Sequence, residues 1–167
     1  PLMLKARTGA YDGRGNAVLK STDPTDVQEA LQKLGVDPDS TSTDLDLYAE
    51  AWVNFTAEIA VMVVKSADAN QPTRTYPAVN AIQQDSICRV VLAPVRDVPL
   101  SVRLECERLA KQVVDSLSKG ASGMFGVELF VTQDQKVLLN EIAPRPHNTG
   151  HYTQDACAVS QFENHLR

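Results

Sequence analysis

Two apolar segments near the C-terminal end of the sequence are separated by a short polar turn, and each carries one glutamate. Residues 124–131 and 136–142 are rich in apolar and β-branched side chains, which is typical of strands. We therefore predict a β-hairpin that turns at residues 134–135. Glu128 and Glu141 are equally distant from this turn, so they face each other with Cβ atoms about 4.5–5.5 Å apart.

Two carboxylates at facing positions of neighbouring strands repel each other unless a positive group neutralises them. A divalent cation can do this, and Mg²⁺ prefers carboxylates together with substrate phosphates. One alternative is that one glutamate pairs with a lysine or arginine. The other is that a loop of odd length shifts the strand register by one residue. If neither alternative applies, Glu128 and Glu141 indicate a magnesium site.

Hydrophobic periodicity divides the rest of the chain into short strands and a few helices. The expected strands cover residues 1–5, 17–19, 45–55, 58–65, 76–82 and 88–93. The expected helices cover residues 24–34 and 99–119, and a last helix is capped by Thr153 with Cys157, Val159, Phe162 and Leu166 on or near its apolar face. This order predicts an α+β fold of mainly antiparallel sheet, in which segments 45–55 and 58–65 pair with each other.

A glycine-rich segment, residues 8–16, joins the first two expected strands. Its three glycines allow the backbone to approach a ligand closely and to direct N–H groups at phosphate oxygens. Lys5 and Arg14 would add positive charge to such a site. The glycine spacing matches neither the Walker nor the dinucleotide-binding pattern, so a solvated hairpin turn is the alternative.

Polar residues also gather in the segment that follows the second glutamate. Arg145, His147, Asn148 and His151 would border the proposed metal and could bind an anionic or polar substrate. The two histidines have the spacing of zinc ligands on a helix, but proline and glycine interrupt the segment, so zinc is not expected. The alternative is a loop that only caps the next helix.

Composition narrows the class of protein. The chain has 167 residues, a net charge of −5 and three cysteines without a Cys-x-x-Cys pair. The negative charge argues against a general nucleic-acid binder, and no apolar run is long enough to span a membrane. Because the sequence starts at Pro1 within an apolar run and ends within a helical pattern, we expect a segment cut at both ends.

The motifs, taken in their order, resemble one family. They are Lys5, then Gly-Ala-Tyr-Asp-Gly-Arg-Gly-Asn, Glu50-Ala51-Trp52-Val53, Glu58, Glu128 and Asn-Glu-Ile-Ala-Pro-Arg-Pro-His-Asn-Thr-Gly-His from Asn140. This series resembles the ATP-grasp domain of 5-(carboxyamino)imidazole ribonucleotide synthetases, in the version found in fungal phosphoribosylaminoimidazole carboxylases. The resemblance covers essentially the whole chain. It implies an ATP-grasp fold with a lid at residues 1–50 and an incomplete base at residues 51–167.

The resemblance also implies a role for each motif. Lys5 would contact the phosphates of ATP, and a mobile loop would close over nucleotide and bicarbonate, formed by Ala10, Tyr11, Asp12, Gly13, Arg14, Gly15 and Asn16. The adenine would be read by Glu50, Ala51, Trp52 and Val53, and the ribose by Glu58. Mg²⁺ would be held by Glu128 and Glu141 with Asn140 beside them. The catalytic group would face the carboxyphosphate and the aminoimidazole ribonucleotide. Its members would be Arg145, His147, Asn148 and His151, together with Tyr11 and Asp12.

The implied activity is the ATP- and bicarbonate-dependent carboxylation of 5-aminoimidazole ribonucleotide in purine biosynthesis, by a cytoplasmic enzyme. A mutase-like domain in the same full-length chain and a homo-oligomer are further expectations, and the segment alone should show little activity. Gln83 stands where relatives carry a histidine near the nucleotide, so an amide would replace an imidazole at that contact. The alternatives are another ATP-grasp ligase, such as a formate-dependent purine enzyme or biotin carboxylase, and a non-catalytic module that binds Mg·ATP.

Overall fold

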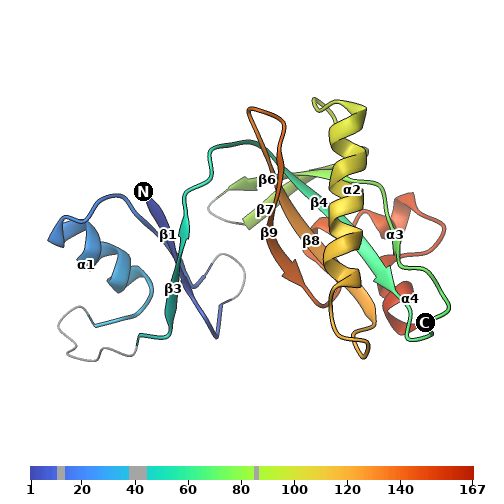
Figure 1. Cartoon of the computed structure of the whole chain (residues 1–167), viewed down its shortest axis with the longest axis horizontal. Helices are drawn as coiled ribbons and strands as arrows, with labels where there is room; N and C mark the ends of the chain where they lie inside the picture. Colours follow the sequence, from blue (N-terminus) through green and yellow to red (C-terminus); the bar gives the residue numbers. More distant parts are fainter. Residues whose placement is uncertain (11–13, 38–44, 85–86) are drawn as a thin grey trace. The chain divides into compact units, whose positions relative to one another are not determined.

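The computed structural model describes residues 1–10, 14–37, 45–84 and 87–167 (Figure 1). The chain divides into two compact units. The first is Pro1–Val53, and the second comprises Asn54–Gln84 and Cys88–Arg167. The assignment of residues 1–50 as a lid and of 51–167 as a base stays a prediction.

The first unit contains a three-stranded sheet in the order β2-β1-β3. Strands β1 (Leu2–Ala6) and β2 (Asn16–Leu19) form the expected antiparallel hairpin, with a regular register from the Leu2–Leu19 pair to the Lys5–Asn16 pair. Helix α1 (Pro24–Lys33) packs against β2. Pro24 begins this helix as predicted, because a missing N–H costs nothing at the first helical position.

Strand β3 (Leu47–Ala51) pairs with β1 and not with the strand that follows it. The expectation that segments 45–55 and 58–65 pair with each other is therefore wrong. The chain leaves the strand conformation after Ala51 and begins β4 (Phe55–Lys65) in the second unit. Periodicity shows that both segments are apolar, but it does not show which strand each one contacts.

The second unit is built on an antiparallel sheet in the order β7-β6-β4-β8-β9, with the short β5 paired to β4. Its remaining strands are β5 (Arg74–Thr75), β6 (Val79–Gln84), β7 (Ile87–Leu92), β8 (Gly123–Thr132) and β9 (Val137–Ala143). Helix α2 (Leu100–Asp115) lies across this sheet (Figure 1). Alternate residues of β4 and β8 form the main core together with one stripe of α2.

Two further expectations need correction. The strand expected at residues 76–82 is split into β5 and β6, because Pro77 lies between them and proline cannot donate to the sheet. The last expected helix is also broken. Helix α3 (Thr153–Ala156) ends where Cys157 adopts an extended backbone, and helix α4 (Gln161–Leu166) begins after Ser160, whose side chain accepts from the N–H of Glu163. Thr153 is therefore the first residue of α3 and does not cap the helix. Leu166, which was expected on or near an apolar face, is 86% exposed.

Within the described ranges, no helix has the length and apolar character needed to cross a membrane.

Candidate functional site

The β8–β9 hairpin brings the two glutamates together, although not by the turn that the sequence predicted. A three-residue loop closes the hairpin between Thr132 and Lys136, with Gln135 at a positive φ of 61°. Near this loop the register differs by one residue from the predicted one, so that Leu129 pairs with Leu139. The register then shifts at a β-bulge, and beyond it Glu128 pairs with Glu141.

The extra residue of the bulge is Asn140. In a bulge, two successive residues of one strand lie opposite a single residue of its partner. Asn140 has no partner in the ladder and lies between the Leu129–Leu139 and Glu128–Glu141 pairs, so the bulge adds an oxygen-bearing residue next to the two paired glutamates. The predicted pairing of the glutamates is confirmed, and the register shift that was its alternative is also present and is compensated by the bulge.

Glu58 lies on the next strand of the same sheet face. Glu58 of β4 pairs with Phe130 of β8, and two positions further along Ala60 pairs with Glu128. Burial raises the pKa of the Glu58 carboxyl. Burial also raises the pKa of the Cys88 thiol, and the negative charges of Glu128 and Glu58 raise it further. The carboxylates of Glu58, Glu128 and Glu141 thus share one sheet face, which we call the carboxylate face. Strand alternation places Gln83 of β6 on this face as well, and it is half-buried.

His147 lies over this face at the start of the following loop. Its Nε2 atom is 3.8 Å from Oε1 of Glu128, and both side chains are nearly buried. The ring fits because Gly126 leaves room below it, since a Cβ at that position would lie 2.5 Å from Cβ of His147. Thr149, fully buried, contacts the other ring nitrogen at 2.8 Å. Glu128 and His147 are therefore held together by the packing of strand and loop.

The other polar residues of the loop are exposed. Arg145 donates to the carbonyl oxygen of Pro146, Asn148 begins the short 3-10 helix η1 (Asn148–Gly150), and the ring of His151 stacks on Phe162. Gln161, to which the sequence analysis assigned no role, is fully buried beneath this loop and hydrogen-bonds to it. A glutamine in a short helix carries no local pattern that reveals a contact with a distant loop.

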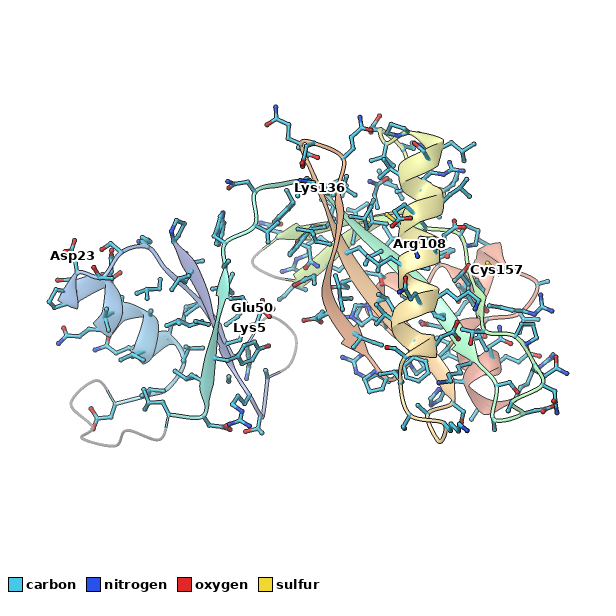
Figure 2. All side chains as sticks on the ribbon, viewed as in Figure 1. Lys5, Asp23, Glu50, Arg108, Lys136 and Cys157 are labelled. Carbon is cyan, nitrogen blue, oxygen red and sulfur yellow. The ribbon has the colours of Figure 1, made fainter. Side chains whose placement is uncertain are left out.

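The predicted nucleotide-contacting residues of the first unit lie on its sheet and at its ends. Lys5 of β1 forms an ion pair of 2.7 Å with Glu50 of β3 (Figure 2), which the sequence did not indicate. Ala51 ends β3, and Trp52 and Val53 follow it. Asn16 begins β2, and Ala10, Arg14 and Gly15 are the neighbouring residues of the glycine-rich segment 8–16 that the structure describes. Tyr11, Asp12 and Gly13 lie outside the described residues, so their predicted roles are not examined by the structure.

Gly15 shows why glycine is needed at the base of this tip. Its φ is +82°, and a Cβ there would lie 2.7 Å from the Cβ of Ala10. The backbone of Ala6 donates to the carbonyl oxygen of Gly15 over 2.8 Å. The described ends of the glycine-rich segment are therefore drawn together by the β1–β2 pairing.

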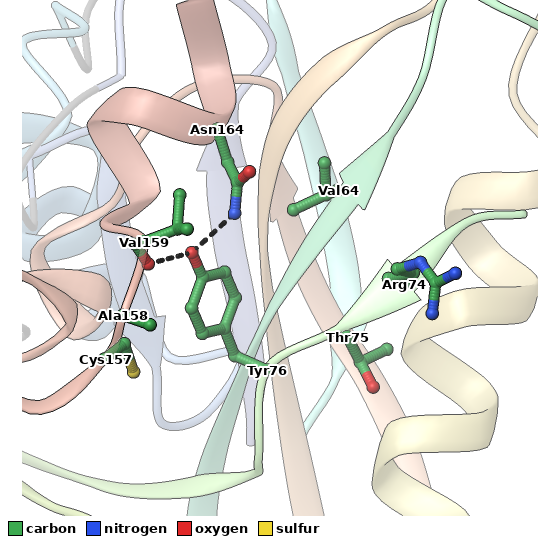
Figure 3. Close-up of a pocket in the computed structure, with 8 residues that line it drawn as sticks. All are labelled: Val64, Arg74, Thr75, Tyr76, Cys157, Ala158, Val159 and Asn164. Carbon is green, nitrogen blue, oxygen red and sulfur yellow. Dashed lines mark hydrogen bonds between the residues drawn. The ribbon is translucent and has the colours of Figure 1, made fainter. Parts of the chain in front are cut away.

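A cavity of about 410 Å³ lies elsewhere in the second unit, beside Tyr76 (Figure 3). The Tyr76 hydroxyl donates to the carbonyl oxygen of Val159 over 2.7 Å and accepts from the Asn164 amide over 2.7 Å. These bonds join Tyr76 to α4 and to the segment before it. The phenol thus has a structural role, and neither Glu128 nor Glu141 lines this cavity.

The donor set of the carboxylate face suits one kind of metal. The described residues contain no group of three or more His, Cys, Asp or Glu placed to hold a metal ion. Mg²⁺ does not need such a group, because it keeps several waters and binds through one or two carboxylates plus substrate phosphates. Glu128 and Glu141, with the Asn140 amide beside them, fit that requirement.

Comparison with known proteins identifies the family of the chain. A family model of the ATP-grasp domain matches residues 1–162. The phosphoribosylaminoimidazole carboxylase of Saccharomyces cerevisiae is 48% identical over 167 residues, which is 100% of this chain and 27% of that protein. The chain thus spans little more than a quarter of the length of that curated relative.

Solved structures give the same result. The carboxyaminoimidazole ribonucleotide synthase of Aspergillus clavatus complexed with ATP matches with a TM-score of 0.87 at 46% identity, over 100% of this chain and 40% of that one. The N5-carboxyaminoimidazole synthase of the same organism, in complex with ADP and 5-aminoimidazole ribonucleotide, matches with a TM-score of 0.83 at 44% identity, over 100% and 39%. The fold and family expected from the sequence motifs are confirmed, and the chain belongs to the ATP-grasp family.

Proposed function

We propose that this chain is the ATP-grasp part of an enzyme that carboxylates 5-aminoimidazole ribonucleotide with ATP and bicarbonate in purine biosynthesis. The observation that carries the proposal is the pairing of Glu128 with Glu141, followed directly by a loop whose His147 reaches Glu128. This pairing collects negative charge that a Mg²⁺–phosphate group would neutralise. The relative bound to ADP and 5-aminoimidazole ribonucleotide supports the choice of substrate.

The proposed reaction has two steps. An oxygen of bicarbonate attacks the γ-phosphorus of ATP, which forms carboxyphosphate and releases ADP. The amine of the ribonucleotide then attacks the carboxyl carbon, phosphate leaves, and the amine loses a proton. Both steps need positioning, charge neutralisation and exclusion of water rather than a nucleophilic side chain.

The residues have distinct proposed tasks. Glu128 and Glu141, with Asn140 beside them, would hold Mg²⁺, which supplies positive charge to the phosphate oxygens. Lys5 would contact phosphates, Glu58 the ribose hydroxyls and residues 50–53 the adenine. Arg145, His147, Asn148 and His151 would orient carboxyphosphate and the ribonucleotide. Residues 10–16 would close over the nucleotide, with Tyr11 and Asp12 contacting the reacting groups.

The wider setting of the chain is part of the same proposal. It covers 27% of the yeast carboxylase but 40% of the N5-carboxyaminoimidazole ribonucleotide synthase of Bacillus subtilis, to which it is 36% identical. The longer relatives have room for the mutase-like domain that the motifs imply. We propose a cytoplasmic enzyme, with small-molecule substrates and a homo-oligomeric state as further features.

The test uses a chimaera in which residues 1–167 replace the aligned segment of the Saccharomyces cerevisiae relative. ADP formation should depend on both bicarbonate and 5-aminoimidazole ribonucleotide. Glu141→Gln should lower turnover by at least about tenfold, whereas Glu105→Gln, on the exposed face of α2, should not. ADP formation that is equal with and without the ribonucleotide would contradict the proposal. Binding of Mg·ATP without any turnover would instead support a non-catalytic module.

A further inference from the structure

The side chain of Gln161 makes a two-point contact with the backbone of the loop that follows the carboxylate pair. It is fully buried at the first position of α4. Its Oε1 accepts from the N–H of His147 over 2.9 Å, and its Nε2 donates to the carbonyl oxygen of the same residue over 2.9 Å. The amide thereby satisfies a buried backbone donor and a buried backbone acceptor, which would otherwise destabilise the loop.

This contact fixes which way the amide points. A backbone N–H can only donate and a carbonyl oxygen can only accept, so Oε1 and Nε2 of Gln161 cannot be exchanged. The second proton of Nε2 is directed at Nδ1 of His151, 3.0 Å away. Nδ1 must therefore accept, and the neutral ring of His151 carries its proton on Nε2.

The other histidine of the loop has different surroundings. Nδ1 of His147 lies 3.4 Å from the backbone N–H of Thr149 and 2.8 Å from Thr149 Oγ1, a hydroxyl that can donate or accept. The fixed orientation of the Gln161 amide therefore assigns a tautomer to His151 alone.

The packing around Gln161 leaves the amide little room to move. A Cβ at Gly150 would lie 2.3 Å from Oε1 of Gln161, so the loop backbone rests directly on the amide. The N–H of Gln161 donates to Thr153 Oγ1 over 2.9 Å, and that hydroxyl donates to the carbonyl oxygen of Gly150 over 2.7 Å. These contacts join the start of α4 to the loop.

We propose that Gln161 is a positioning residue. It holds the 144–151 loop in place and keeps His151 in the tautomer whose Nε2–H is available to an anionic or carbonyl oxygen. Its consequence for turnover rests on the function proposed above, whereas the tautomer rests on the chain alone.

The first test reads the tautomer directly. The chain contains three histidines, so long-range ¹H–¹⁵N spectra of residues 1–167 give three ring systems that single substitutions assign. At about pH 8, where a free imidazole is neutral, His151 should show a bare Nδ1 and a protonated Nε2. A protonated Nδ1 would overturn the proposal, and this measurement on the unmodified chain does not depend on the folding of any variant.

The second test replaces the donor. Gln161→Glu keeps an oxygen for the N–H of His147 but has no N–H for His151, so Nδ1 of His151 should gain a proton. His165, whose Nδ1 accepts from the backbone of Met124 over 3.1 Å, is the internal reference and should not change. Gln154→Glu is the matched control, because Gln154 is exposed and contacts the carbonyl oxygen of His151 rather than its ring.

The third test measures turnover in the chimaera. Gln161→Glu should lower kcat by about 10- to 100-fold while KM for ATP stays within about twofold, because the proposed nucleotide contacts lie elsewhere; Gln154→Glu should change neither. Unchanged kcat together with an unchanged tautomer would overturn the proposal. If the unmodified chimaera shows no turnover that depends on the ribonucleotide, the proposed function fails, and the spectra still decide the role of Gln161.

Discussion

The described part of the chain brings charged side chains together across neighbouring antiparallel strands in each of its two units, and the combinations of charge differ. In the first unit Lys5 of β1 meets Glu50 of β3 at 2.7 Å, so a cation contacts an anion. The contact is diagonal, because Lys5 pairs with Tyr48 and Glu50 pairs with Met3. In the second unit Glu128 of β8 is paired with Glu141 of β9, so an anion faces an anion. Opposite charges at such positions stabilise a sheet, and like charges destabilise it.

The difference separates a contact that stabilises its sheet from one that points to a ligand. Glu50 has its counter-ion within the sheet. Near Glu128 the structure places Glu141, Glu58 and an imidazole, and burial raises the pKa of the Glu58 carboxyl. Like charges that lie this close repel one another, and a bound cation would neutralise them. The acidic cluster is therefore the stronger evidence for function.

The largest expected effect comes from filling the space that lets His147 lie over Glu128. In Gly126→Val, the new Cβ would meet Cβ of His147 at 2.5 Å, and neither atom is at the end of a flexible chain. The free energy of unfolding should fall by about 1–3 kcal/mol, measured by urea denaturation with circular dichroism. Strand propensity alone predicts the opposite sign, because valine favours strands more than glycine does.

The control for this change is Gly120→Ala, at a position where a Cβ meets nothing within 4 Å. It should leave the urea midpoint nearly unchanged. A Gly126→Val variant as stable as the original chain would show that His147 can move away at no cost. The contact between His147 and Glu128 would then not be a fixed part of the carboxylate face.

A smaller effect is expected at the pair of opposite charges. Lys5→Met and Glu50→Gln should each lower the free energy of unfolding, and the double variant should reveal a coupling of about 0.2–1 kcal/mol. The coupling should fall in high salt, because Glu50 is 41% exposed. Urea midpoints of the four proteins at low and high salt give this value.

The two variants also separate the structural task of Lys5 from its proposed binding task. If Lys5 contacts phosphates, Lys5→Met should weaken Mg·ATP binding in a titration of residues 1–167, whereas Glu50→Gln should weaken it less. Equal losses from both variants would mean that the ion pair, and not a phosphate contact, accounts for the effect.

Sequence reasoning worked best where side chains are fixed by strand alternation. The β8–β9 hairpin, the facing glutamates and the α+β class follow from apolar periodicity and were confirmed. The pairing was nevertheless predicted from a two-residue turn, while the structure has a three-residue loop and a compensating bulge at Asn140. A bulge leaves no mark in apolar periodicity, so it could not have been predicted.

Contacts between segments that are distant in the sequence were the other feature that could not be predicted. The sequence did not indicate that β3 pairs with β1, because apolar composition says nothing about which strand is a neighbour. It did not indicate Gln161 either, whose importance comes from a contact with His147 fourteen positions away in the chain. Both depend on how distant segments meet, which local patterns do not encode.

The smallest expected effect concerns the pH dependence of stability that arises from the carboxylate face. Burial raises the pKa of Glu58 from its ordinary value of 4.5, so the folded chain holds this proton more tightly than the unfolded chain does. Stability must then fall as the pH rises from 4.5 through the raised pKa, because the unfolded state binds fewer protons in that window. Glu58→Gln removes this dependence. The variant should therefore be more stable than the original chain at pH 7, by less than about 1 kcal/mol because solvent screens a half-buried charge.

Urea midpoints at pH 4 and pH 7 measure this difference, and Glu29→Gln on the exposed side of α1 controls for the simple loss of a charge. The advantage of Glu58→Gln over the original chain should shrink as the pH is lowered, since the carboxyl is then protonated in both states. An original chain that is more stable than the variant at pH 7 would mean that a cationic partner outweighs burial at Glu58. The carboxylate face would then resemble the Lys5–Glu50 pair, and its like charges would no longer require a bound ligand.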